Sequence, residues 1–170
     1  MYFHFRDVSA KGHEPIVRET FAADTIVRDR SDIRAIKPVD VELTAKAEDD
    51  GLIDVQGQLT ATAELTCSRC LVPHTETYVI PFHEQFKLTD STDLPLDDEG
   101  DVIYVTDDRV DLTPFVEEAL FVHLPLTSFC DESCKGLCAT CGTNRNEQSC
   151  DCSNERIDPR LAGLKDFFKK

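Results

Sequence analysis

The sequence predicts an α+β fold: an antiparallel β-meander core with one packed helix, a Cys-rich zinc-knuckle segment and a short C-terminal helix. Three successive stretches alternate apolar and polar residues, a later stretch repeats apolar residues with a helical period, and most cysteines lie in the last quarter of the chain. A period of two buries one face of a strand, and a period of 3.6 buries one face of a helix. We expect a β-rich domain over residues 1–129, then a zinc-binding segment and a C-terminal helix over residues 130–170.

The alternating stretches predict three consecutive strands. The first covers Val39–Ala47 and the second Ile53–Cys67. The residues Asp49-Asp50-Gly51 supply the turn between them, because glycine tolerates a positive φ. The third covers Val72–Leu88, where Pro81 indicates an edge strand or a bulge, since proline has no N–H to donate to a neighbouring strand.

Other parts of the chain carry weaker patterns. Tyr2–Val8 and Ile16–Ala22 are candidate short strands, whereas residues 24–36 have no assignable pattern. Residues 89–111 are rich in acids, which is typical of a solvated loop, with one candidate strand at Val102–Val105.

Residues 112–124 predict a helix. Thr113 is a candidate N-cap, Pro114 suits the first helical position, and Pro125 ends the helix. Apolar residues recur at helical spacing along one side, which buries that side against the sheet. His123 lies on the same side, so we interpret it as a packed core histidine rather than a metal ligand.

The chain is strongly acidic, with 33 Asp and Glu against 18 Lys and Arg and a formal net charge of −15. Eleven of the acids lie between Asp90 and Glu118, where Arg109 is the only base. Direct binding of free nucleic acid is disfavoured, because such binding relies on Lys and Arg at phosphates. The same charge would attract a basic protein, and solubility alone is the competing explanation.

The sequence predicts a cytoplasmic protein. It contains no apolar run long enough to span a membrane, and its first residues lack the pattern of a secretory signal. Because disulfides rarely persist in the cytoplasm, the eight cysteines indicate metal or redox chemistry.

The cysteines have the spacings of structural zinc sites. They form two CxxC pairs, one CxxxC pair and one CxC pair: Cys67 and Cys70, Cys138 and Cys141, Cys130 and Cys134, Cys150 and Cys152. A structural Zn²⁺ takes four thiolates in a tetrahedron, often two of them from one tight turn. We therefore predict one or two structural Zn²⁺ ions. Catalytic zinc and thioredoxin-like chemistry are disfavoured, because HExxH is absent and neither CxxC opens a helix after a strand.

Arithmetic allows two four-cysteine sites. The preferred partition places Cys138, Cys141, Cys150 and Cys152 in one local site, and it joins Cys67 and Cys70 to Cys130 and Cys134. The second site would link the tip between two strands to the segment after the helix. Two alternatives stay open: both CxxC pairs in one site with a poorer second site, and one zinc site with four free thiols.

Two segments resemble the YceD family, known as large ribosomal RNA subunit accumulation proteins. They are Leu65–Leu71, after an alternating strand, and Cys130–Cys152. The resemblance runs from about residue 39 to the end of the chain. It implies a non-enzymatic ribosome biogenesis factor that supports accumulation of large-subunit ribosomal RNA. Its expected partner is a basic ribosomal protein or a pre-ribosomal particle, with no catalytic residues, small-molecule substrate or membrane.

Two other functions compete with this interpretation. A redox-switched zinc holdase chaperone would carry zinc on a CxC pair and a CxxC pair, as the tail does. A zinc-ribbon RNA-binding module would need a basic surface, whereas acids and bases are balanced from Cys130 onward.

Overall fold

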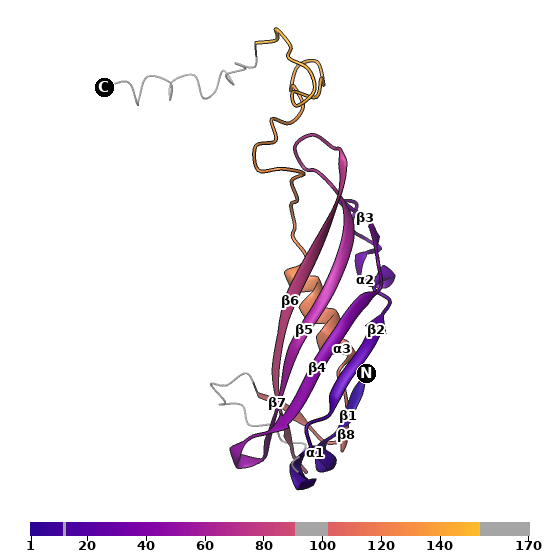
Figure 1. Cartoon of the computed structure of the whole chain (residues 1–170), viewed down its shortest axis with the longest axis vertical. Helices are drawn as coiled ribbons and strands as arrows, with labels where there is room; N and C mark the ends of the chain where they lie inside the picture. Colours follow the sequence, from indigo (N-terminus) through magenta and orange to yellow (C-terminus); the bar gives the residue numbers. More distant parts are fainter. Residues whose placement is uncertain (12, 91–101, 154–170) are drawn as a thin grey trace, which may run out of the picture.

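A curved six-stranded sheet organises the chain, and the computed structural model describes residues 1–11, 13–90 and 102–153. The long strands run along the length of the molecule, and the Cys-rich segment lies at one end (Figure 1). The strand order is β2-β4-β5-β6-β7, and β3 also pairs with β5. The strands are β2 (Ile16–Phe21), β3 (Ile33–Ile36), β4 (Val39–Ala47), β5 (Leu52–Thr66), β6 (Pro73–Leu88) and β7 (Val102–Val105).

The predicted meander is confirmed. Strands β4, β5 and β6 pair antiparallel in sequence order. The first alternation buries Val39, Val41 and Leu43, as a period of two requires. The turn after β4 contains the 3₁₀ segment η1 (Asp49–Gly51), in which Asp50 and Gly51 have φ of 62° and 73°.

The sheet is mixed rather than purely antiparallel. Strand β7, which the sequence marked as a candidate, runs parallel to the end of β6, with Gln85 opposite Val102. On the other side, β2 pairs antiparallel with β4. Strand β3 lies in the span without a predicted assignment and pairs with β5 beyond the end of the β4 ladder.

The prediction of one strand over Tyr2–Val8 is only partly right. Strand β1 (Tyr2–His4) ends early, and α1 (Phe5–Lys11) follows it. Phe5 and Val8 are both buried, because residues three apart share one face of a helix. Strand β1 pairs with β8 (Arg109–Asp111) in a separate two-stranded sheet. The short helix α2 (Asp24–Val27) precedes β3.

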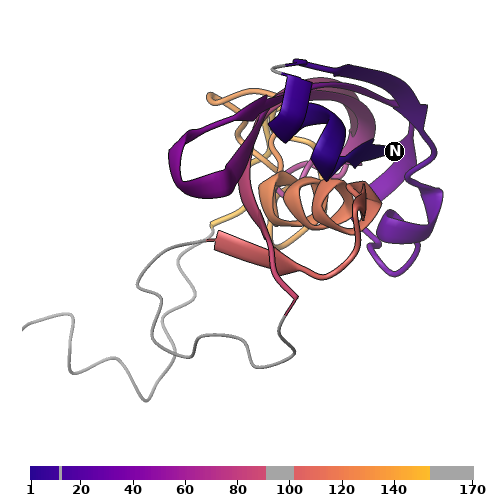
Figure 2. The same cartoon turned by 90° about the horizontal axis from the view of Figure 1, so that it is seen from below.

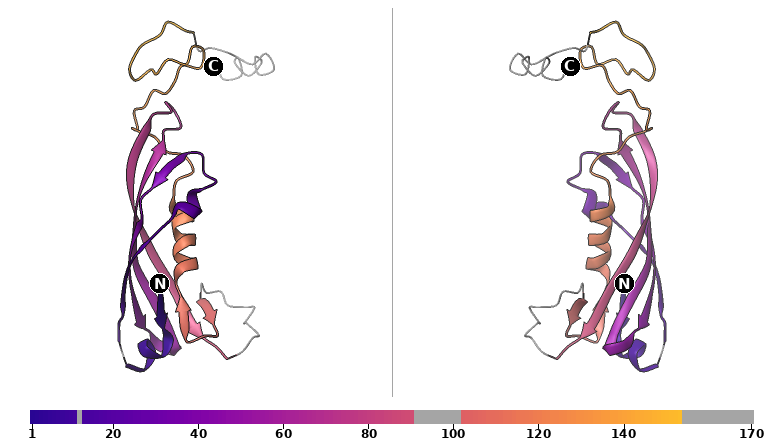
Figure 3. Two further views of the ribbon diagram at one scale, coloured as in Figure 1. Left: turned by 90° about the vertical axis from the view of Figure 1, so that its right-hand side faces the viewer. Right: turned by 90° about the vertical axis from the view of Figure 1, so that its left-hand side faces the viewer.

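The predicted helix is α3 (Thr113–His123), and it packs against one face of the sheet (Figures 2 and 3). Val116 and Leu120 are fully buried in the core between the two layers. No helix in the described ranges is long and apolar enough to cross a membrane. The predicted C-terminal helix falls in residues 154–170, outside the described residues.

Two details of α3 differ from prediction. The N-cap of α3 is Leu112, not Thr113, and it makes no side-chain cap. Asp111 lies just before it, and its Oδ1 accepts hydrogen bonds from the Thr113 N–H at 2.9 Å and hydroxyl at 2.7 Å. His123 is exposed rather than packed in the core. Its ring points toward the preceding turn of the helix, where its Nδ1 lies 2.8 Å from the Ala119 carbonyl oxygen.

Strands β4 and β5 approach unusually closely at Gly57. A Cβ added there would lie 2.0 Å from the Glu42 carbonyl oxygen and 2.8 Å from the Leu43 Cα. Only glycine, which has no Cβ, allows this approach of two backbones.

Candidate metal centres

The first cysteine cluster lies at the tip of the β5–β6 hairpin. Cys67 and Cys70 come from the turn, Cys130 and Cys134 from the segment after α3, and their sulfurs lie within 4.8 Å of one another. The Cys70 and Cys130 sulfurs are 3.5 Å apart, and those of Cys67 and Cys134 are 3.9 Å apart. Thiolates at ~2.3 Å from one tetrahedral ion would lie about 3.8 Å apart. The cluster therefore fits a single tetrahedral metal ion.

The second cluster is local to the tail. The sulfurs of Cys138, Cys141, Cys150 and Cys152 also lie within 4.8 Å of one another. Cys138 is buried, whereas the other three are exposed or half-buried. The structure therefore brings the eight cysteines together in the preferred partition, and the alternative with both CxxC pairs in one site is wrong.

The two CxxC turns share one backbone geometry. The N–H of the residue after each pair, Leu71 or Gly142, donates to the carbonyl of the first cysteine, Cys67 or Cys138, at 2.9 Å. Both Leu71 and Gly142 have positive φ, 60° and 75° respectively. This turn directs both sulfurs of each pair to one point, but it places a leucine in a conformation that favours glycine.

Replacing Leu71 by glycine is expected to stabilise the protein by about 1 kcal/mol, because it removes the strain of a left-handed leucine. Leu71 is 61% exposed, so little buried surface is lost. The measurement is chemical denaturation of the metal-loaded protein. The matched control is Leu71→Ala, which shortens the side chain but keeps the Cβ, and equal stability of the two variants would contradict the prediction.

Thiolates are stabilised in both clusters without a metal. Burial alone would raise the pKa of Cys67, but nearby backbone N–H groups outweigh it and lower the pKa to about 6. The pKa of Cys130 is raised to about 12, chiefly by its hydrogen bond with the Cys70 sulfur. In the second cluster, Thr143 is the main cause that lowers the pKa of Cys141 to about 6. A metal would thus meet preformed thiolates and displace the remaining protons, which makes binding pH-dependent.

Arg69 lies between the two cysteines of the first turn, and it holds in place the segment that supplies the other two cysteines of the first cluster. Its Nη1 donates to the carbonyls of Glu132 at 3.0 Å and Cys134 at 3.1 Å, and its guanidinium lies 4.3 Å from the centre of the Phe129 ring. Its own carbonyl accepts the Leu137 N–H at 2.9 Å. One residue therefore holds the segment that carries Cys130 and Cys134.

Replacing Arg69 by methionine is expected to weaken metal binding at the first cluster by about tenfold, as is typical for loss of a group that orients the ligands. Methionine keeps the contact with Phe129 but loses both bonds to carbonyls. Competition with a chelator measures the affinity, and the second cluster is the internal control. Equal loss at both clusters would show general unfolding instead.

Asn146 connects the two clusters. It belongs to the loop within the second cluster, yet its Oδ1 accepts the Lys135 N–H at 2.7 Å, and its Nδ2 donates to the Cys134 sulfur at 3.3 Å. A backbone bridge between Leu137 and Asn144 lies alongside. Sequence reasoning missed Arg69 and Asn146. The position of Arg69 inside the CxxC was an available signal, whereas nothing in the sequence marked Asn146 beyond its turn-forming loop.

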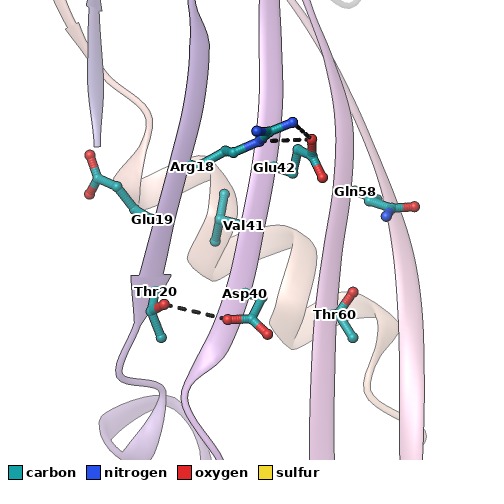
Figure 4. A pocket seen from close by; sticks show the side chains of 8 residues that line it. All are labelled: Arg18, Glu19, Thr20, Asp40, Val41, Glu42, Gln58 and Thr60. Atoms are coloured by element: carbon teal, nitrogen blue, oxygen red, sulfur yellow. Dashed lines mark hydrogen bonds and ion pairs between the residues drawn. The ribbon is translucent and has the colours of Figure 1, made fainter.

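The open face of the sheet is polar, and its polar side chains form hydrogen bonds with one another. In a hollow of about 310 Å³, Arg18 donates to Glu42 at 2.6 Å and 2.9 Å, and the Thr20 hydroxyl donates to Asp40 at 3.4 Å (Figure 4). These are cross-strand pairs between β2 and β4 on an exposed surface, and they stabilise strand pairing.

Comparison with known families agrees with the cysteine pattern. The family model described as "Large ribosomal RNA subunit accumulation protein YceD" matches residues 55–168, which include all eight cysteines. The chain belongs to the YceD family. The fold described above, with its two four-cysteine clusters, is therefore that of a YceD protein, and no solved structure matches it.

Relatives of this YceD chain occur in bacteria and plants. It is 32% identical over 155 residues to the uncharacterized protein YlbN of Bacillus subtilis, covering 89% of this chain and 87% of that protein. It is 30% identical over 126 residues to Rv2926c of Mycobacterium tuberculosis, covering 74% and 60%. The chloroplastic "Large ribosomal RNA subunit accumulation protein YCED homolog 1" of Arabidopsis thaliana is 35% identical over 50 residues, or 29% of this chain and 16% of that one. The chain thus spans less than two thirds of the mycobacterial and plant relatives.

Proposed function

We propose that this protein is a non-enzymatic, cytoplasmic ribosome biogenesis factor that supports accumulation of large-subunit ribosomal RNA. The observation that carries the proposal is membership of the YceD family, whose description names that role. The plant relatives carry the same description. The clusters support a structural role for metal, since each offers four cysteines and leaves no ligand position for a substrate.

Each cluster would hold one Zn²⁺. Four thiolates within tetrahedral reach are the donor set that structural zinc prefers. Bound zinc would fix the hairpin tip and the tail in one arrangement. It would also add negative charge, because eight thiolates outweigh two divalent ions.

The protein would act by binding a basic ribosomal protein or a pre-ribosomal particle. A net charge of −15 supports this, because it speeds encounters with a positively charged partner and repels bare RNA. The acidic protein would shield basic residues of its partner until ribosomal RNA replaces it.

Depletion of the protein tests the biological role. We expect large-subunit ribosomal RNA to fall relative to small-subunit ribosomal RNA, measured by quantifying both species in the same cells. Tagged protein should also retain large-subunit ribosomal proteins at low salt and release them at high salt. Normal ribosomal RNA levels after depletion, or no salt-sensitive association, would contradict the proposal.

A further inference from the structure

In the described part of the chain, most of one edge of strand β6 has no partner strand. Along its whole length it pairs with β5, from Pro73 to Lys87, but β7 covers its other edge only at Gln85–Leu88. Among the described residues, no strand pairs with that edge between Pro73 and Glu84. Figure 1 shows β6 at the border of the sheet, with β7 beside its lower end alone.

The alternation of hydrogen bonds shows which groups this edge presents. The Cys67 N–H donates to the Val72 carbonyl at 3.0 Å, so these two residues form a hydrogen-bonded pair. In an antiparallel pair, every second residue bonds to the partner strand, so the even-numbered residues of β6, in step with Val72, bond to β5. The odd-numbered residues therefore direct their N–H and C=O away from β5. Pro73 and Pro81 both fall at such positions, where the missing N–H costs the β5 ladder nothing. The N–H groups that point outward belong to Thr75, Thr77, Val79 and His83.

This edge lacks the lysines that often protect an exposed strand, and its charged residues are Glu76 and Glu84. No Lys or Arg occurs between Pro73 and Glu84, and the side chain of Val79 is 63% exposed. By contrast, the opposite edge strand β2 carries Arg18 and Glu19. Only the two prolines interrupt the row of donors on β6.

A groove of about 340 Å³ lies between β6 and α3, next to the unpaired edge. Phe82, Ala119 and Val122 provide its apolar lining, and Val122 is 69% exposed. Glu84 and Glu118 also line it, beside His83 and His123, and no lining residue that the structure describes is Lys or Arg. The groove therefore suits a segment with an apolar side chain and flanking positive charges.

We propose that the unpaired edge of β6 binds an extended, basic segment of a ribosomal protein as an added strand. Side chains on one face of that strand would enter the groove, and those on the other would lie beside Val79. Pairing of an extended peptide with a sheet edge gains affinity from backbone hydrogen bonds and specificity from alternate side chains. The proposal rests on the proposed function and names the surface that would carry it out.

Hydrogen exchange tests the pairing. The probe is a synthetic peptide of three Lys-Val-Lys-Thr repeats, and the control peptide of equal charge has proline in place of threonine, which prevents strand pairing. We expect the first peptide to slow exchange at the amides of Thr77 and Val79, while neighbouring even-numbered amides, already bonded to β5, change little. Binding without this alternating protection, or equal binding of the control peptide, would overturn the proposal.

The matched variants are Val79→Pro and Val79→Thr. Proline removes one outward N–H without touching the β5 ladder, as Pro73 and Pro81 already do, whereas threonine keeps it. We expect Val79→Pro to weaken peptide binding by about fivefold and Val79→Thr to leave it nearly unchanged. Equal affinity of the two variants, with unchanged melting temperatures, would overturn the proposal.

Retention of purified large-subunit ribosomal proteins separates this inference from the proposed function. If the wild-type protein retains them and the Val79→Pro variant does not, the inference and the proposed function both stand. If the two proteins retain them equally, the edge is not the binding surface, although the proposed function stands. If neither protein retains them, the proposed function fails. A dimer of wild-type protein that Val79→Pro makes monomeric would show instead that a second copy occupies the edge.

Discussion

Replacing Cys67 and Cys70 together by serine is expected to remove one of two bound zinc ions and to lower the free energy of unfolding by at least about 3 kcal/mol. Structural zinc binding supplies on the order of 10 kcal/mol in small domains, so losing one site far exceeds a typical surface mutation. The buried Cys134 would also lose its partner sulfur, 3.9 Å away in Cys67. Metal analysis of the purified, reduced protein and chemical denaturation measure the two effects.

The matched variant is Cys150→Ser with Cys152→Ser. This variant should also lose one zinc ion. Its cluster, however, links only the short segment 138–152, and three of its four cysteines are exposed or half-buried. We therefore expect a smaller loss of stability than in the hairpin variant. Protein prepared under reducing conditions that contains no metal at all would refute the zinc assignment for both clusters.

Replacing Gly57 by alanine is expected to destabilise the sheet by about 3 kcal/mol or more, because the added Cβ meets backbone that cannot rotate away. The Cβ would lie 2.0 Å from the Glu42 carbonyl oxygen, so β4 and β5 would have to separate in the middle of their ladder. Thermal or chemical denaturation measures the loss.

Gly51→Ala is the control for this variant. Gly51 has a φ of 73° but no atom within 4 Å of an added Cβ, so it tests the backbone preference alone. We expect a cost of about 1 kcal/mol there. If the two alanine variants were equally stable, the close approach at Gly57 would not constrain the sheet.

The parts of the fold that the sequence predicted are those with long, regular patterns. Strands β4 and β5 each bury one face over many residues, and the apolar residues of α3 recur over three turns. Strand β6 buries Ile80, Phe82 and Phe86 in its second half. Short elements carry too few residues for a period to be visible, which is why α2 and β3 were not assigned. Helix α1 was missed because Phe3 and Phe5 are spaced two apart, as buried residues of one strand are. Both are buried, but Phe3 belongs to β1 and Phe5 begins α1.

The candidate site could be predicted only in part, for a similar reason. Cysteine spacing identified the eight sulfurs and their preferred grouping, because ligands of one ion come in short pairs. The contacts of Arg69 and Asn146 are with backbone carbonyls, an N–H and a sulfur that the fold brings near. Such contacts leave no pattern in the sequence. The parallel pairing of β7 with β6 was hidden as well, since it depends on how the chain returns to the sheet.

The first cluster has a further consequence for stability, because it cross-links the chain. A metal shared by Cys70 and Cys130 would close a loop of residues 71–129, which contains β6, β7, β8 and α3. In the chain-entropy treatment of cross-links, a loop of this length removes about 4 kcal/mol of unfolded-state entropy. Elements that contribute no cysteine, α3 among them, would therefore become less resistant to unfolding when the metal is removed.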